Sequence, residues 1–232
     1  MIEVIALDAD DTLWMNEIRY LQATERFKTL LSEYQPDELI GQSLDEVEGM
    51  NISTYGYGIK SFALSMIETA LSLTDGQIRG PQIKDIIDIA KEMLTAEIDH
   101  IDHAEATLIE LSRDYDLMLI TKGDQFEQQG KIDRSGLAKY FRYIEILGEK
   151  TKESYLRLVK NYKIDPSRFL MVGNSLRSDI LPVIAIGGRA VYIPHEPTWF
   201  HEKVAVEEIY EQRYDELEHI GQLPGFIESL VK

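Results

Sequence analysis

The sequence contains no cysteine among its 232 residues. This absence excludes disulfide bonds, thiolate metal sites and a cysteine nucleophile, so any chemistry must use oxygen and nitrogen groups. Basic residues are also scarce, because 24 Lys and Arg stand against 41 Asp and Glu, and the formal net charge is -17. Such a charge disfavours non-specific attraction to nucleic acid or to an anionic membrane. A small anionic substrate would therefore need local cations.

Long apolar runs are absent as well. No segment approaches the roughly 18 apolar residues of a membrane span, and the N-terminal apolar run is followed by acids and has no basic leader. We therefore expect a cytoplasmic protein. Hydrophobic residues still make up 44% of the chain and charged residues 28%, which is typical of a soluble globular protein. The length allows one large domain, or one domain that carries an inserted second one.

The most informative stretch is the N-terminal one, where Asp8, Asp10 and Asp11 follow the mostly apolar residues 2–7. The run is short and β-branched, which favours a buried central strand. Acids at the carboxyl end of such a strand lie where open α/β sheets bind ligands. The alternative interpretation is a polar turn followed by a helix cap, since Asp is common at both places. Further motifs must decide between the two.

The order of the predicted elements indicates two domains. Apolar spacing predicts helices over about residues 18–34, 36–48, 59–74 and from 81 onwards, with a loop at 51–60 where two Gly interleave two Tyr. Helices then alternate with strands at 117–120, 143–147, 169–172 and 190–193, which predicts a doubly wound parallel sheet of the α/β class. We expect a core domain of residues 1–14 and 104–232, and a helical domain of residues 15–103.

The pattern Asp8-x-Asp10-x-Thr12 after a strand resembles the first motif of the haloacid dehalogenase (HAD) superfamily, whose core is a Rossmann-like sheet. The helical block is similar to the cap domain that some members insert after this motif. The resemblance implies that Asp8 is a nucleophile that becomes an aspartyl phosphate, and that Asp10 is the general acid and base. It also implies that the Asp10 backbone carbonyl faces a metal ion.

Two further motifs of the family have counterparts in chain order. Thr121, at the end of a predicted strand, matches the second motif, and its hydroxyl with the backbone amides of Lys122 and Gly123 could hold phosphate oxygens. Lys150 best matches the motif lysine, which would pair with Asp8 and offset phosphate charge. The family often has Pro after that lysine, whereas Thr stands here, so Lys152 remains a rival.

The fourth motif resembles Gly-Asp-Ser-x-x-x-Asp, but the first acid is an amide in this chain: Asn174 precedes Ser175, and Asp179 follows. An amide oxygen can still bind a hard cation such as Mg²⁺, which prefers oxygen ligands. The resemblance thus implies a Mg²⁺ site made by Asp8, Asp10, Asn174 and Asp179. We expect metal binding to survive, in a weakened form.

Asp10 also bears on the reaction. A dehalogenase attacks carbon and needs no acid for the halide, so Asp10 favours phosphate chemistry. We therefore predict a Mg²⁺-dependent phosphatase acting on a small phosphorylated metabolite, with Lys60, Tyr55 and Tyr57 of the cap as candidate substrate contacts. The alternatives are a sugar phosphomutase of the same superfamily, or a catalytically weak binding protein on this scaffold. Nothing in the sequence indicates the oligomeric state.

Overall fold

A computed structural model describes residues 2–197, 199 and 214–231 of the chain. It divides into two compact units, a sheet unit of residues 1–17 and 98–232 and a helical unit of residues 18–97. These boundaries differ from the expected ones at 14/15 and 103/104. The chain passes between the two units twice, and the two connecting segments are hydrogen-bonded to each other: Met15 N–H donates to the Asp99 carbonyl at 2.9 Å, and Ile101 N–H donates to the Leu13 carbonyl at 3.0 Å. Both segments therefore belong to the sheet unit.

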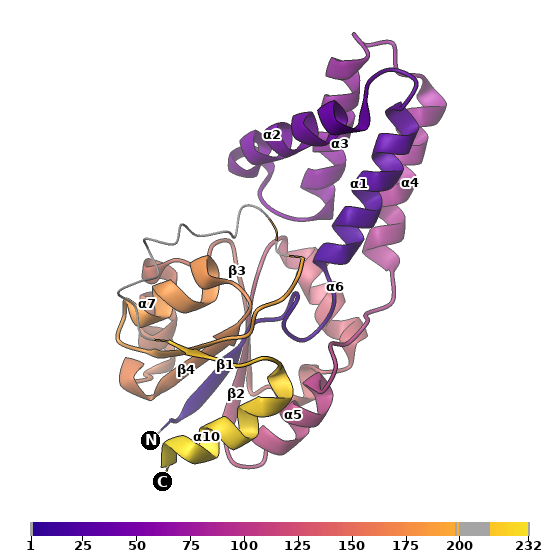
Figure 1. Cartoon of the computed structure of the whole chain (residues 1–232). Coiled ribbons are helices and arrows are strands. Elements are labelled where there is room, and N and C mark those ends of the chain that lie inside the picture. Colours follow the sequence, from indigo (N-terminus) through magenta and orange to yellow (C-terminus); the bar gives the residue numbers. More distant parts are fainter. Residues whose placement is uncertain (1, 198, 200–213, 232) are drawn as a thin grey trace. The chain divides into compact units, whose positions relative to one another are not determined.

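The sheet unit confirms the predicted α/β class with a doubly wound parallel sheet (Figure 1). In the described residues the sheet has six strands in the order β3-β2-β1-β4-β5-β6, and every pair is parallel. The last strand was not predicted. The strands are β1 (Val4–Leu7), β2 (Asp116–Lys122), β3 (Tyr143–Leu147), β4 (Phe169–Gly173), β5 (Arg189–Tyr192) and β6 (Asp215–Glu216).

Helices cover both faces of this sheet because the central strands are apolar at successive positions, so that both faces must be buried. Ile5 and Leu7 share one core with α5 (Ala104–Leu111), α6 (Gln125–Ser135) and α10 (Leu223–Val231). Val4 and Ala6 share the other core with α7 (Lys152–Tyr162) and α8 (Leu181–Ile184). Short helical turns join these elements at Ala138–Tyr140, Pro166–Arg168, Leu176–Ile180 and Ile220–Gln222.

Strand β1 lies at the point where the strand order reverses. Leu7 at its end is aligned with Leu119 of β2 on one side and with Val172 of β4 on the other. The chain builds β2 and β3 on one side of β1 and then returns to build β4 on the other. Loops leave the sheet in opposite directions at such a switch point, and ligands bind in the resulting crevice. The segments after β1 and β4 meet there.

The helical unit consists of α1 (Glu17–Leu31), α2 (Asp37–Tyr55), α3 (Ile59–Leu73) and α4 (Gly80–Thr95) (Figure 1). Glu17, the first residue of α1, falls in the sheet unit. The apolar faces of these helices form one core, which includes Phe27, Ile40, Phe62, Met66 and Ile86. Among the described residues of either unit, the helices are too short or too polar to cross a membrane.

Helix α2 is longer than expected. The predicted loop at 51–60 is wrong for its first half, because the helix continues through Tyr55 and only Gly56, Tyr57 and Gly58 separate it from α3. The buried Asn51 side chain donates to Ser65 Oγ and Glu68 Oε2, each at 3.1 Å, and so fastens the last turns of α2 to α3. Gly56 and Gly58 have φ of 75° and 112°, values that a side chain disfavours.

Candidate active site

Asp8 lies directly after β1 and is held in place from two sides. Its backbone N–H donates to the Val172 carbonyl of β4 at 2.9 Å. Its buried side chain accepts from Lys150 Nζ through Oδ1, and the same ammonium donates to Asp179 Oδ1 at 2.7 Å. One lysine thus joins the carboxylates that follow β1 and β4. The pairing of Lys150 with Asp8 that the family resemblance implies is present.

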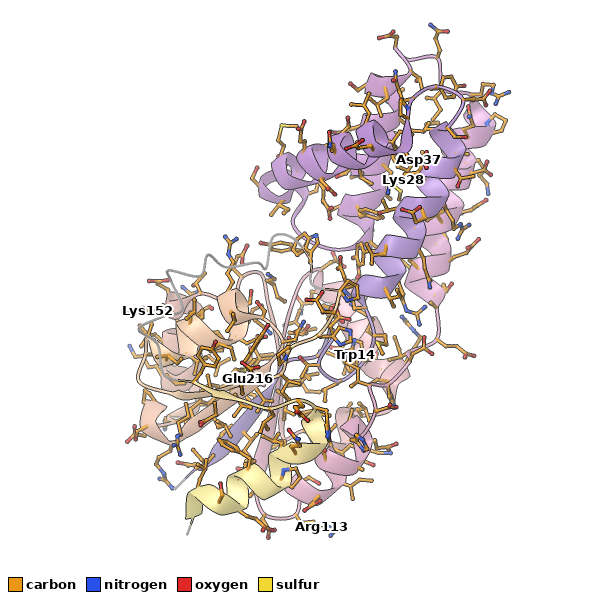
Figure 2. The ribbon with its side chains drawn as sticks, in the orientation of Figure 1. Trp14, Lys28, Asp37, Arg113, Lys152 and Glu216 are labelled. Carbon is orange, nitrogen blue, oxygen red and sulfur yellow. The ribbon has the colours of Figure 1, made fainter. Side chains whose placement is uncertain are left out.

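The position of Lys150 depends on the start of α7. Thr151 caps this helix: its N–H donates to Ser154 Oγ at 2.8 Å, and its Oγ1 accepts from Ser154 N–H at 3.2 Å. This reciprocal pair is a capping-box arrangement, and it replaces the Pro that the family often has. Lys150 is buried just before the cap, whereas Lys152 is exposed in the first turn (Figure 2). The geometry therefore favours Lys150 over its rival.

The charges in this cluster perturb one another. Burial raises the pKa of Asp8 above its ordinary value, although the Lys150 ammonium opposes this rise and the nearby Asp10 adds to it. Burial likewise raises the pKa of Asp179, against the effect of Lys150. Burial alone would lower the pKa of Lys150, but the carboxylates of Asp179 and Asp8 outweigh it and raise that pKa. Lys150 is therefore a permanent cation between two groups that are costly to ionise.

Asn174 follows β4 and faces the segment that follows β1. One end of its amide lies 3.2 Å from each of three oxygens, namely Asp8 Oδ2, the Asp10 backbone carbonyl and Thr12 Oγ1. With the NH₂ group turned inward, the amide donates to all three. With its oxygen turned inward, the amide accepts from the Thr12 hydroxyl at 3.2 Å and faces Asp8 Oδ2 and the Asp10 carbonyl oxygen, and a cation would offset the repulsion among these acceptors. This donor set fits Mg²⁺, which prefers carboxylate and carbonyl oxygens.

Asp179 supports the cluster from the turn after β4. Its Oδ2 accepts from Ser175 N–H at 3.0 Å, while its Oδ1 is held by Lys150. A Cβ at Gly173 would lie 2.2 Å from Asp179 Oδ2, so this packing requires glycine there. The structure places Asp179 with Lys150, whereas the metal-ligand role expected for it stays a prediction.

Asp10 is held by a second set of partners, separate from those of Asp8. Lys131 Nζ lies 2.8 Å from both carboxylate oxygens. The buried Trp14 donates its Nε1–H to Asp10 Oδ1 at 2.7 Å, and Gln128 Nε2 donates to Oδ2 at 3.0 Å. All of these partners are N–H donors, which matches a carboxylate. Asp10 is thus fixed on the side of the site that faces α6.

The three residues expected from the second motif have different surroundings. Thr121 is buried at the end of β2, and its Oγ1 accepts from Gln128 Nε2. Lys122 Nζ donates to Ser178 Oγ at 3.2 Å and lies 6.0 Å from the centre of the Trp199 ring. Gly123 N–H donates to the Leu147 carbonyl at 3.0 Å. Because the pairing of β2 with β3 extends to Gly123, this amide is engaged, which argues against the phosphate contact expected of it.

Lys60 belongs to the helical unit, where it is an exposed residue in the first turn of α3. Tyr55 is likewise exposed at the end of α2, and its hydroxyl donates to Glu68 Oε1 at 3.1 Å. The substrate contacts expected of Lys60, Tyr55 and Tyr57 stay predictions.

Sequence reasoning missed the α6 residues that hold Asp10. Gln128 and Lys131 are spaced by three and therefore share a helix face. Both are buried, as is Glu127, whose Oε1 lies 3.7 Å from Lys131 Nζ. The sequence could have indicated these residues, because the helix directly after the second motif, residues 125–135, has few apolar side chains. A helix of this composition must bury polar side chains if it packs on the sheet.

Comparison with known proteins agrees with this geometry. A family model described as "haloacid dehalogenase-like hydrolase" matches residues 2–187. An N-acylneuraminate-9-phosphatase from Mus musculus is 32% identical over 84 residues. That match spans 34% of this chain and 34% of the mouse protein, so it covers only about a third of the curated relative.

Solved structures extend the likeness to the whole chain. A haloacid dehalogenase-like family hydrolase from Xanthomonas campestris is 36% identical, with a TM-score of 0.88 and coverage of 99% of this chain and 91% of that one. An L-2-haloacid dehalogenase from Xanthobacter autotrophicus is 16% identical, with a TM-score of 0.66 and coverage of 99% and 100%. The latter shows the fold alone. The family model spans most of the chain, and the chain therefore belongs to the haloacid dehalogenase-like hydrolase family.

Proposed function

We propose that this hydrolase is a phosphatase that cleaves a small phosphate monoester through an aspartyl-phosphate on Asp8, with Mg²⁺ as cofactor. The observation that carries the proposal is Asp10, a carboxylate two residues after the nucleophile and held by three N–H donors. Transfer of phosphate from an alcohol requires a proton for the leaving oxygen, whereas displacement of a halide does not. The partial match to a phosphatase supports the same choice.

In the first step, an Asp8 carboxylate oxygen forms a bond to phosphorus. The bond between phosphorus and the leaving oxygen breaks, its electron pair goes to that oxygen, and Asp10, which enters this step in its protonated form, gives the proton that makes it an alcohol. In the second step, Asp10 takes a proton from water as the water oxygen bonds to phosphorus. The Asp8–phosphorus bond breaks with its electron pair returning to Asp8, which releases inorganic phosphate.

The other residues of the site neutralise charge and orient groups. Lys150 keeps a positive charge beside Asp8 throughout, and the Thr121 hydroxyl would donate to a phosphate oxygen. Asp8, the Asp10 carbonyl and Asn174 would hold Mg²⁺. When bound, Mg²⁺ would offset charge on the phosphate oxygens. Lys60 of the helical unit is retained as a proposed contact for a second polar group of the substrate.

Substitution of the nucleophile tests the proposal directly. Asp8→Asn keeps the shape of the side chain but replaces the attacking carboxylate with a poorly nucleophilic amide, so p-nitrophenyl phosphate turnover should fall by at least about 10³-fold. Asp133→Asn, an exposed position on α6, is the matched control and should turn over like the wild type. Acid-quenched mass spectra should show phosphate on Asp8 of the wild type. Undiminished turnover by Asp8→Asn would refute the mechanism.

Metal dependence is the second test. EDTA treatment followed by desalting should abolish activity, and added Mg²⁺ should restore it. Asn174→Asp adds a carboxylate to the oxygen cluster and should tighten Mg²⁺ binding by about tenfold, a difference of about 1.4 kcal/mol. Calorimetric titration with Mg²⁺ measures this without reference to turnover. Full activity of the EDTA-treated protein would contradict a metal-dependent reaction.

A sugar phosphomutase is the second candidate, because it would use the same Asp8 and Asp10. Product analysis separates the two. A phosphatase releases inorganic phosphate from many monoesters of a metabolite panel, whereas a mutase converts a hexose bisphosphate into its isomers and releases little phosphate. Phosphate release from a panel of small monoesters would also identify the substrate class.

A further inference from the structure

The contacts of Asp10 lead beyond the four family motifs to one face of α6. Gln128 and Lys131 are 2% and 7% exposed, and both reach the same carboxylate. Burial of a lysine is costly unless it is paired. Lys131 is paired on every side that the structure shows: it donates to both Asp10 oxygens, to Asn16 Oδ1 at 3.0 Å, and lies near Glu127. The surrounding Asn16 and Glu127 side chains therefore help to hold the Lys131 ammonium against the Asp10 carboxylate.

Gln128 joins the two halves of the site. Its Nε2 group donates to Asp10 Oδ2 and to Thr121 Oγ1. A hydroxyl that accepts one hydrogen bond from a fixed donor keeps its own proton free to donate elsewhere. Thr121 is thereby set to donate toward a phosphate oxygen. Gly123 packs beside the Gln128 side chain, and its φ of 140° is a backbone conformation that residues with a side chain disfavour.

We infer that Lys131 and Gln128 are positioning residues: Lys131 orients the Asp10 carboxylate toward the leaving oxygen, and Gln128 orients both Asp10 and the Thr121 hydroxyl. This inference rests on the proposed phosphatase function. Lys131 and Gln128 therefore have different expected effects on the reaction. Lys131 acts through Asp10 alone, so it matters most where the leaving oxygen needs a proton. Gln128 also acts on the phosphate through Thr121, so it matters for every phosphate ligand.

The experiment compares an alkyl with an aryl phosphate. An alkoxide leaves poorly without a proton, whereas p-nitrophenolate leaves unaided. Lys131→Met should therefore lower kcat/KM for an alkyl phosphate by about 10²-fold, the scale of general acid catalysis, and for p-nitrophenyl phosphate by far less. Lys131→Gln, which keeps an N–H donor without the charge, should show the same selectivity if Lys131→Met folds poorly. Circular dichroism checks the fold of each variant.

Gln128→Met should show a different pattern. It should lower kcat/KM for both substrates and should weaken inhibition by inorganic phosphate, whereas Lys131→Met should leave phosphate inhibition near the wild-type value. Matched controls are Gln129→Met, one residue along α6, and Lys139→Met, which pairs with Glu105 on the surface. Both controls should match the wild type in all three assays.

The outcomes distinguish this inference from the proposed function. If the wild type forms no phosphoenzyme and releases no phosphate, the proposed function fails, whatever the variants do. If the wild type is active and Asp8→Asn is not, but Lys131→Met loses equally on alkyl and aryl substrates or loses nothing, the positioning role of Lys131 is refuted. Unchanged phosphate inhibition in Gln128→Met would refute the role assigned to Thr121.

Discussion

The two units of this protein treat charge in opposite ways. In the described part of the sheet unit, charged side chains are buried at or beside the edge where β1 and β4 end, among them Asp8, Asp179, Lys150 and Lys131. In the helical unit the buried polar side chains are neutral, such as Asn51 and Ser65. Its ion pairs lie at the surface, as Arg26–Glu92 and Lys84–Asp88 do.

This difference indicates which unit bears the groups suited to chemistry. Burial of a charge costs several kcal/mol unless partners compensate it, so a fold that needs stability alone has little reason to bury one. The helical unit achieves its packing with apolar side chains and neutral hydrogen bonds. The sheet unit instead retains two buried lysines, each shared between carboxylates. Its charged edge is therefore the candidate active site, whereas the core of the helical unit holds its helices together.

The largest expected effect tests the buried cluster. Lys150→Met leaves Asp8 and Asp179 without their shared cation, so the free energy of unfolding should fall by about 3–5 kcal/mol. The loss should shrink as pH falls, because protonation of the two carboxyls, whose pKa values burial already raises, removes their repulsion. Urea unfolding at pH 8 and pH 5 measures both effects. Lys152→Met, at an exposed position, is the control. If Lys150→Met lost as little stability as this control, the contrast between the two units would be contradicted.

An intermediate effect concerns Glu48, a partly buried acid of the helical unit. Burial raises its pKa to about 7, and Asp45 adds to the rise. The folded state therefore prefers the protonated acid, and its stabilising effect is present below the ordinary pKa and is lost as pH rises through about 7. Glu48→Gln should raise stability at pH 8 by about 1–2 kcal/mol, allowing for solvent screening.

The same variant should hardly change the stability at pH 4, where Glu48 is largely protonated in both the folded and the unfolded state. Thermal unfolding at the two pH values provides the measurement. An equal effect of the substitution at the two pH values would show that Glu48 does not titrate in this range. The helical unit would then tolerate a partly buried charge better than its contrast with the sheet unit implies.

The smallest effect concerns the surface pairs of the helical unit. Arg26 and Glu92 have side chains that are 52% and 61% exposed, and such pairs contribute little. Arg26→Gln should change the free energy of unfolding by no more than about 0.5 kcal/mol. Urea unfolding in low and high salt provides the check. A loss near that of Lys150→Met would abolish the contrast between the units.

Local patterns in the sequence were enough for most elements. Strand β3 was predicted with the bounds that the structure shows, because it is a short apolar segment between polar breaks. The end of α2 was not, since the bonds from Asn51 to Ser65 and Glu68 connect two helices. Strand β6 has two residues, Asp215 and Glu216, and nothing in their polar character indicates a strand. Pairing with β5 alone defines it.

The sequence by itself determined the order of the strands and helices and the candidates Asp8, Asp10, Thr121, Lys150, Asn174 and Asp179, because strand periodicity and short motifs are local properties of the chain. Only the tertiary structure decided how these candidates are connected. It selected Lys150 over Lys152 by burial beside Asp8, and it brought Lys131 and Gln128 to Asp10 across more than a hundred residues. The cost of burying a charge depends on every partner around it, and those partners come from separate strands and helices that meet only when the sheet forms.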